Sequence, residues 1–339
     1  MKSQADQATK IKIIQLIISA ILLGLFLTWI DFSQLKQSIV KADGFYLGMA
    51  LGVVCINRVL MPVKWNILVK AKQIHIGWFD VIKIYYISSF LGLYLPPTVG
   101  ADSVRVYYTA KKGYSVPDVL TSIIVERALG FLVLILFVLF GCVIFIHCFT
   151  NIVFDIHNIL LISLLINLLI LFGFFISMSN YFIQVFSNFL MRLSSRKLIG
   201  KAANMLYILF QSYCLYKSKK KFLTVFFLLT CAEMVLPITR SYFIAKAFNI
   251  SLPLYYYFAF VPIVIFLIRL PISADGFGIH EGGFAYFLSL MGVSQTLGFS
   301  VGVISHCLLW VSLVPGLIFY IFEKKGSSLF QLGKPKSNE

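Results

Sequence analysis

The segments LPPTVGADSVR (residues 95–105) and LPISADGFGIHE (residues 270–281) each interrupt an apolar run of the chain. When their Leu-Pro pairs are aligned, Arg105 and His280 both fall nine residues after the first proline. Proline removes a backbone donor and clashes with the preceding helical turn, and glycine then lets the chain reverse. In lipid, such irregular backbone survives only inside protein or beside a wet cavity. We therefore expect two re-entrant helical hairpins, each entering the membrane, turning and leaving on the same side.

The composition of the chain indicates that its solvent is mostly lipid. Of 339 residues, 60% are hydrophobic and 12% are charged, and the mean hydropathy is +0.91. A soluble domain carries about 25% charged residues. The net charge of +16 would indicate nucleic-acid binding in a soluble protein, but here the basic residues flank apolar runs, as the positive-inside rule predicts. We expect no nucleic-acid partner.

The apolar runs that are long enough to cross a bilayer predict six transmembrane helices. They cover residues 12–30, 44–62, 118–146, 158–178, 222–245 and 297–322. Lys and Arg gather in residues 1–12, 58–117, 180–221 and 323–339, whereas residues 147–157 contain none. This bias places both chain termini in the cytoplasm. The predicted fold class is an all-α polytopic membrane protein.

The two interrupted segments occupy equivalent positions in two halves of opposite orientation. The membrane domain, residues 1–323, contains a first half at about 44–146 and a second at about 222–322. Residues 180–221 mix apolar and basic side chains and predict interfacial helices, and residues 324–339 form a cytoplasmic tail. Broken segments in inverted repeats indicate a transport site near the bilayer midplane. The alternative is that both segments are ordinary loops outside the membrane.

Charged residues within the apolar runs are the candidates for a binding site. Guanidinium groups pair with phosphate through two parallel hydrogen bonds. The predicted headgroup-binding residues are Arg105, Arg127, Arg269, Arg240 and Lys64, and the predicted counter-ions are Glu126, Glu233 and Glu281. The predicted cavity and hinge residues are Pro96, Pro97, Gly100, Asp102, Pro271, Ser273, Asp275, Gly276 and Gly278. The alternative is that these charges only hold helices together or reach out to lipid headgroups, and that Asp102, Asp275 and His280 cap the hinges.

Signals for enzymatic chemistry are weak. The chain contains no G-x-S-x-G, H-E-x-x-H or P-loop motif. Its five histidines are scattered without metal-ligand spacing, and its six cysteines form no C-x-x-C pair. We predict no catalytic residue, no metal site and no cofactor.

Two clusters of residues resemble the flippase-like membrane family that includes the transmembrane region of lysylphosphatidylglycerol synthase. The first cluster is Asn57, Arg58, Lys64, Trp65, Ser89, Phe90, residues 95–102, Arg105, Ser122, Glu126 and Arg127, and the second is residues 270–273, Gly276, Gly278 and Glu281. The similarity covers roughly residues 10–322. It implies a multi-pass protein of the prokaryotic plasma (inner) membrane, with two re-entrant segments around a lipid cavity. The family pattern has Gly-Gly before the Asp, where this chain has Gly100-Ala101.

The leading functional hypothesis is a lipid translocase that handles an anionic phospholipid or a polyprenyl-linked lipid. No soluble aminoacyl-transfer domain like that of the bifunctional synthase is evident, so we expect no aminoacyl transfer from tRNA. One alternative is a membrane-embedded transferase of the glycosyl or aminoacyl type, with Asp102, Asp275 or Glu281 as its base. Another is an accessory subunit that organises envelope-synthesis enzymes. Membrane lipids are the predicted partners, with a second copy of the chain or envelope-synthesis enzymes as further candidates.

Overall fold

The computed structural model describes residues 39–95, 100–148, 179–194, 200–270 and 272–332, with scattered residues in 24–37 and 161–177. Within this part of the chain the regular elements are helices and no strand occurs, which confirms the all-helical prediction. The predicted spans 12–30 and 158–178 lie wholly or mostly outside the described residues, as do Pro96, Pro97 and Pro271.

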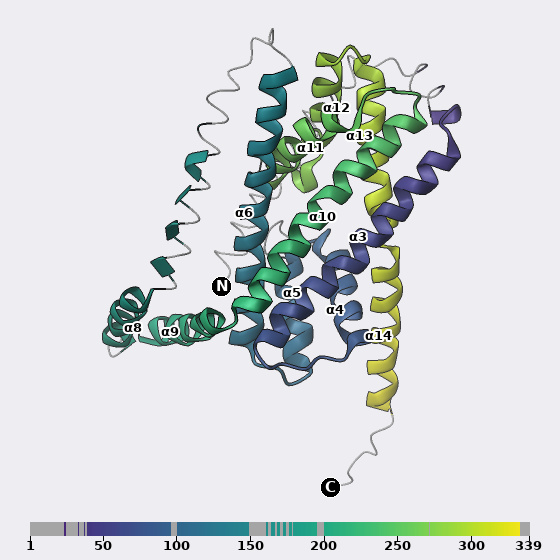
Figure 1. Cartoon of the computed structure of the whole chain (residues 1–339). Helices are drawn as coiled ribbons and strands as arrows, with labels where there is room; N and C mark the ends of the chain where they lie inside the picture. The colour runs from purple at the N-terminus through teal and green to yellow at the C-terminus, as the bar shows by residue number, and fades with distance from the viewer. Residues whose placement is uncertain are drawn as a thin grey trace.

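The helices follow one another in two groups that flank a pair of short helices (Figure 1). The first group is α3 (Gly44–Ala71), α4 (Trp78–Gly92), α5 (Gly100–Lys111) and α6 (Val116–Cys148). The short helices are α8 (Asn180–Ser194) and α9 (Gly200–Cys214), followed by the 3₁₀ turn η1 (Leu215–Ser218). The second group is α10 (Lys220–Ala247), α11 (Leu254–Arg269), η2 (Ala274–Gly276), α12 (Ile279–Leu290), α13 (Gln295–Val311) and α14 (Val314–Leu332).

Four segments of the described chain are long and apolar enough to cross a membrane. They are Gly44–Ala71, Val116–His147, Lys220–Ala247 and Gln295–Glu323. Each coincides with a predicted span, so the chain is a multi-pass membrane protein. The predicted end of the first of them, at residue 62, is wrong, because α3 continues through Pro62 to Ala71. Its 28 residues make a helix of about 42 Å, longer than a bilayer core of about 30 Å, and α3 runs obliquely through the body (Figure 1).

The two groups share an order of elements at opposite ends of the molecule. Helices α3 and α10 are both 28 residues long and contain an internal proline, Pro62 and Pro237 respectively. They pack side by side and run in opposite directions (Figure 1). A pair of shorter helices follows each: α4 with α5 at one end of the body, and α11 with α12 at the other. The candidate site lies between these two pairs.

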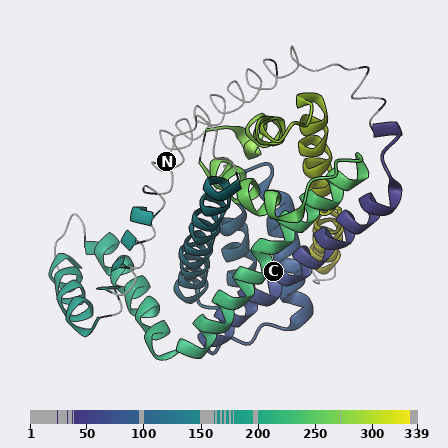
Figure 2. The same cartoon turned by 45° about the horizontal axis from the view of Figure 1, so that its top comes forward.

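Helices α8 and α9 form an appendage that projects sideways from the body (Figure 2). They are held together by aromatic contacts, with the Phe186 and Phe210 ring centroids 4.7 Å apart at 73°. Tyr181 and Phe189 of α8 are exposed. The two helices occupy the segment for which interfacial helices are predicted.

Glycines allow the closest helix contacts of the body. A Cβ atom added at Gly141 of α6 would collide with the carbonyl oxygen of Ala259 on α11, and one added at Gly316 of α14 would collide with the carbonyl oxygen of Tyr86 on α4. By contrast, a Cβ added at Gly130, also on α6, would meet nothing within 4 Å. The contact of α6 with α11 therefore depends on one specific glycine.

This difference predicts that Gly141→Ala destabilises the protein and Gly130→Ala does not. Overpacking a close contact costs about 1–3 kcal/mol, whereas alanine at an open helical position gains roughly 0.5–1 kcal/mol over glycine. The melting temperature of detergent-purified protein measures both effects. Equal melting temperatures for the two variants would contradict the α6–α11 contact.

A polar cluster joins α3, α6 and α9 immediately after the α3 span. The Lys72 ammonium donates hydrogen bonds to the carbonyl oxygen of Ser212 and, at 2.7 Å, to its Oγ. It also lies 3.7 Å from Asp118 Oδ1 and 4.6 Å from the centre of the Tyr216 ring. Burial lowers the pKa of Lys72 from its ordinary 10.5 to about 8, although Asp118 opposes this shift.

Because the folded state holds the Lys72 proton less tightly than the unfolded state, the free energy of unfolding should rise as the pH increases from about 8 towards 10.5. Below pH 8 both states are protonated and this contribution is constant. Lys72→Met removes the titrating group, so the difference in melting temperature between wild type and variant should change across this window. A difference that is independent of pH would refute the shift.

Candidate functional site

A cavity of about 470 Å³, here called the central cavity, lies between the two short helix pairs. It is lined by residues of α3, α6, α10 and α11, by residues of the turn and helix that follow α11, and by Tyr85 of α4 and Leu309 of α13. A second cavity of about 340 Å³ adjoins it. The two share Arg127, Ile268, Asp275, His280 and Leu309. Together they form a continuous space in which charged side chains lie among apolar ones.

Arg105 is buried beside the central cavity, and two carboxylates pair with its charge, although its Nε has no hydrogen-bond partner among the described residues. One terminal nitrogen of its guanidinium lies 2.6 Å from Asp102 Oδ1 and the other 2.6 Å from Glu126 Oε2. The rings of Trp65 and Tyr85 flank the group, with centroids 5.2 and 4.9 Å from its central carbon. Its charge is therefore neutralised by the protein itself. Glu126, one of the three predicted counter-ions, is one of its two acidic partners.

Arg127 differs from Arg105 because it is half exposed. Its Nε and one terminal nitrogen both lie 3.0 Å from the carboxylate of Asp102. Asp102 also pairs with Arg105, so two guanidinium groups share one carboxylate. The side chain of Arg127 is 49% exposed and lines both cavities. It can take an additional anion without losing Asp102.

Lys64 lies inside α3 and is buried, because the helix continues past residue 62. Its ammonium pairs with Glu233 and donates to Thr230 Oγ1 at 3.1 Å, both on α10. Lys64 and Glu233 both line the central cavity. This ion pair joins α3 to α10. The partner of Glu233, one of the predicted counter-ions, is therefore Lys64.

Three further arginines line the cavities without an acidic partner. Among the described residues, no carboxylate lies within 4.0 Å of Arg58, Arg240 or Arg269. Arg58 of α3 donates to Ser312 Oγ at 2.8 Å, and in the part of the chain that the structure describes the buried Nε of Arg240 on α10 has no hydrogen-bond partner. Arg269, the last residue of α11, is exposed and faces the central cavity. These groups add positive charge to the cavity walls, and of the three Arg240 is the buried one.

Unusual backbone shapes the turn between α11 and α12. Gly276 and Gly278 have φ of 78° and 80°, and Asp275 has φ of 50°. Glycine adopts this region without strain, whereas a side chain at Gly276 would also meet Ile268 at 2.6 Å. Ser273 is buried in the same turn, and its Oγ has no partner. The turn aims the Asp275 side chain at both cavities.

The corresponding break before α5 is also tight. A Cβ added at Gly100, the first residue of α5, would collide with Leu95. Its neighbour Ala101, which stands where the family pattern has a second glycine, lines the smaller cavity and packs against Gly92 of α4. The small residues therefore let α4 and α5 approach closely at this end.

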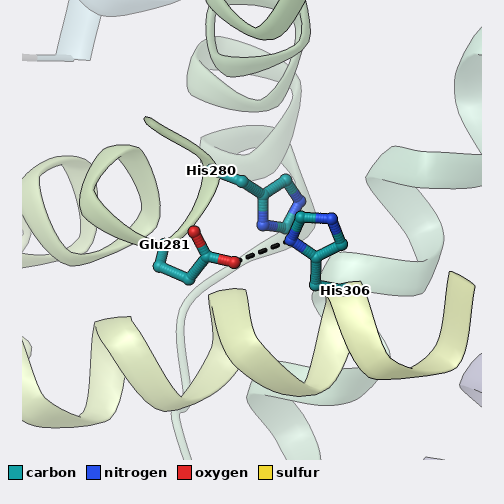
Figure 3. A group of neighbouring side chains, drawn as sticks. All are labelled: His280, Glu281 and His306. Atoms are coloured by element: carbon teal, nitrogen blue, oxygen red, sulfur yellow. Dashed lines mark hydrogen bonds and ion pairs between the residues drawn. The ribbon is translucent and has the colours of Figure 1, made fainter. Parts of the chain in front are cut away.

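Glu281 does not pair with an arginine, contrary to its predicted role as a counter-ion. Its Oε1 lies 2.7 Å from His306 Nδ1 (Figure 3), and its Oε2 accepts the Gly278 N–H at 2.8 Å. Helix α13 can approach this closely because Gly302, one turn before His306, has no side chain: a Cβ there would meet Glu281 Cα at 2.7 Å. His280 belongs to the same buried group (Figure 3).

Sequence reasoning missed Arg58, Tyr85 and His306 as members of the site. Arg58 lies 254 residues from its partner Ser312, and 25 residues separate Glu281 from His306. Such separations carry no spacing signal. The position of Arg58 on α3 could have revealed it. Pro62 follows four residues later, and the buried Lys64 comes two residues after Pro62.

A curated relative supports a membrane assignment. The chain is 24% identical over 131 residues to the UPF0104 membrane protein PH1989 of Pyrococcus horikoshii. The match covers 38% of this chain and 39% of that protein, so the chain spans about two fifths of the relative's length.

A family model described as "Lysylphosphatidylglycerol synthase TM region" matches residues 12–316. This range includes both helix pairs, both cavities and all the charged residues described above. Since the match spans most of its length, the chain belongs to the lysylphosphatidylglycerol synthase TM region family, a family of membrane proteins related to lipid handling.

Proposed function

We propose that this chain is a lipid translocase that binds an anionic lipid headgroup in the central cavity and carries it across the bilayer. One observation carries the proposal: Arg58, Arg240 and Arg269 line the cavities with no carboxylate of the described residues within 4.0 Å. The lipid is an anionic phospholipid or a polyprenyl phosphate-linked lipid. Both present the same phosphate chemistry to the guanidinium groups.

The energetic argument starts from the cost of unpaired charge. A charged side chain at the bilayer centre costs roughly 2.5–3.5 kcal/mol on insertion scales, and an isolated buried ion costs more. Arg240 also experiences the like charge of Arg58, whereas at Arg269 the like charge of Arg127 is opposed by Glu233 and Glu126. An anion that enters the cavity would relieve the penalty on the buried Arg240. Guanidinium groups suit phosphate because two parallel N–H donors match its oxygens.

The dimensions of the cavity favour a headgroup as the bound part. A volume of about 470 Å³ is in the range of small-molecule sites, roughly 300–1,000 Å³. Acyl or polyprenyl chains would exceed it and would stay in the surrounding hydrocarbon. The headgroup would thus cross inside protein while the tails remain in lipid.

The roles of the predicted site residues divide according to their pairing. Arg127, Arg240 and Arg269 bind the headgroup, and Arg58 extends the positive field into the smaller cavity. Arg105 with Asp102 and Glu126, and Lys64 with Glu233, are positioning pairs that hold the walls of the cavity. Their charges are already matched, so they add little to the attraction for an anion.

The two helix pairs supply the transport path in this proposal. They act as re-entrant hairpins of two inverted halves, residues 44–146 and 222–322, within six crossings and with both termini in the cytoplasm. Helices α8 and α9 lie on the inner leaflet. Transporters built from inverted repeats bind substrate at the repeat interface and alternate access around it. The opposite placement of the two pairs in Figure 1 supports this arrangement.

The proposal predicts faster transbilayer movement of anionic lipids. Purified protein is reconstituted into vesicles that contain fluorescent phosphatidylglycerol, phosphatidylserine or a polyprenyl phosphate, and loss of outer-leaflet fluorescence is followed after quenching. At least one anionic lipid should equilibrate faster than in protein-free vesicles, and faster than phosphatidylcholine. No acceleration across the whole panel would sink the proposal.

Removal of a single cavity charge should weaken this activity. Arg240→Gln and Arg269→Gln should each slow transbilayer movement about tenfold or more, because a hydrogen bond to a charged group contributes about 1.5–3 kcal/mol. Lys201→Gln on α9 is the matched control, since it removes one exposed charge outside the cavity. Equal loss in the control would assign the effect to general surface charge instead.

A further inference from the structure

Three buried side chains converge beside the two cavities. His280 and Glu281 lie in the first turn of α12, and His306 lies on α13. Each offers one ligand atom, and these atoms all lie within 4.8 Å of one another (Figure 3). The three residues are 5%, 2% and 6% exposed. The proposed transport of lipid uses none of them.

One atom of this group is left without a partner. The Nδ1 atom of His280 is buried and has no hydrogen bond in the described part of the chain. A buried polar atom without a partner costs about 1–3 kcal/mol, so an unpaired imidazole nitrogen needs an explanation. His280 lines both cavities, so its ring lies next to them.

We propose that His280, Glu281 and His306 form a binding site for a divalent transition metal ion, with Zn²⁺ as the preferred occupant. Imidazole nitrogen suits zinc and its neighbours, whereas Mg²⁺ and Ca²⁺ require oxygen ligands. Two histidines and one glutamate are a ligand set that leaves zinc a fourth, open position. That position would face the cavities that His280 and His306 line.

The surroundings of the three ligands meet the needs of such a site. Metal-bound histidine usually donates its second ring N–H to a carboxylate or carbonyl oxygen. When His306 Nδ1 binds the ion, its Nε2 faces Asp275 Oδ2, which lies 3.6 Å away. The second oxygen of Glu281 is already fixed by the Gly278 N–H. The carboxylates of Glu281 and Asp275 would together balance the charge of a divalent ion.

Binding requires only small movements. In a tetrahedral zinc site with bonds of about 2.0–2.1 Å, the ligand atoms lie about 3.3 Å apart. The present spread of 4.8 Å can close by rotation of the side chains. The ion would replace the hydrogen bond that now joins His306 Nδ1 to Glu281 Oε1, and a proton on His306 Nδ1 would leave to solvent.

The test uses the full chain, purified in detergent without a histidine tag, stripped with EDTA and dialysed against Zn²⁺. Elemental analysis should give one zinc per chain, and zinc should raise the melting temperature. His280→Gln and His306→Gln should each lower the bound zinc at least tenfold. His75→Gln is the matched control, because His75 is exposed and lies between α3 and α4. Retention of zinc by both site variants would overturn the proposal.

X-ray absorption at the zinc edge of the wild-type protein covers the case in which the variants do not fold. It should show imidazole scattering with first-shell distances of about 2.0–2.1 Å. Zinc bound without imidazole, or no zinc bound at all, would also overturn the proposal. The test does not involve lipid, so its outcome is separate from that of the transport experiment.

Discussion

The structure depends on one constraint: every charge inside the bilayer must be balanced by something nearby. Arg105 meets it with Asp102 and Glu126, and Lys64 meets it with Glu233. In hydrocarbon these pairs cannot be exchanged for water, so they fix the helices that carry them. The fold therefore brings α5 to α6 and α3 to α10 at the same points where charge is matched. In the proposed function, the positions where charge is unmatched form the binding site.

The interrupted helices make this arrangement possible. A continuous helix across the membrane presents its side chains along one line, whereas a helix pair presents the end of one helix and the start of the next. The turn after α11 thus places Arg269, Asp275 and His280 around one space. Positive φ at Asp275, Gly276 and Gly278 forms this turn. Glycine is favoured at position 276 because it adopts positive φ without strain, and because Ile268 of α11 leaves no room there for a side chain.

The sequence predicts the described spans well but predicts the site only in part. Hydrophobic length is a local property, so the spans that became α6 and α10 could be located to within a few residues. The end of α3 was missed because residues 63–71 include the polar side chains of Lys64 and Asn66, which look like the end of an apolar run. In the structure both side chains are buried within the protein. Partner choice is not local: Lys64 and Glu233 are 169 residues apart. The arginines could be recognised as interior charges, but their division into paired and unpaired groups required the fold.

The two halves share an order of elements but not a distribution of charge. Nine residues after the first proline, the first half has Arg105, clamped by two carboxylates, whereas the second half has His280, a group that is neutral unless protonated. Arg269, just before the second break, has no carboxylate of the described chain within 4.0 Å. An anion drawn between the halves would therefore be attracted mainly to the walls formed by α6, α10 and α11. In the proposed translocase, this positive charge between the two breaks is the part of the cavity that each side of the membrane would reach in turn, as in other transporters built from inverted repeats.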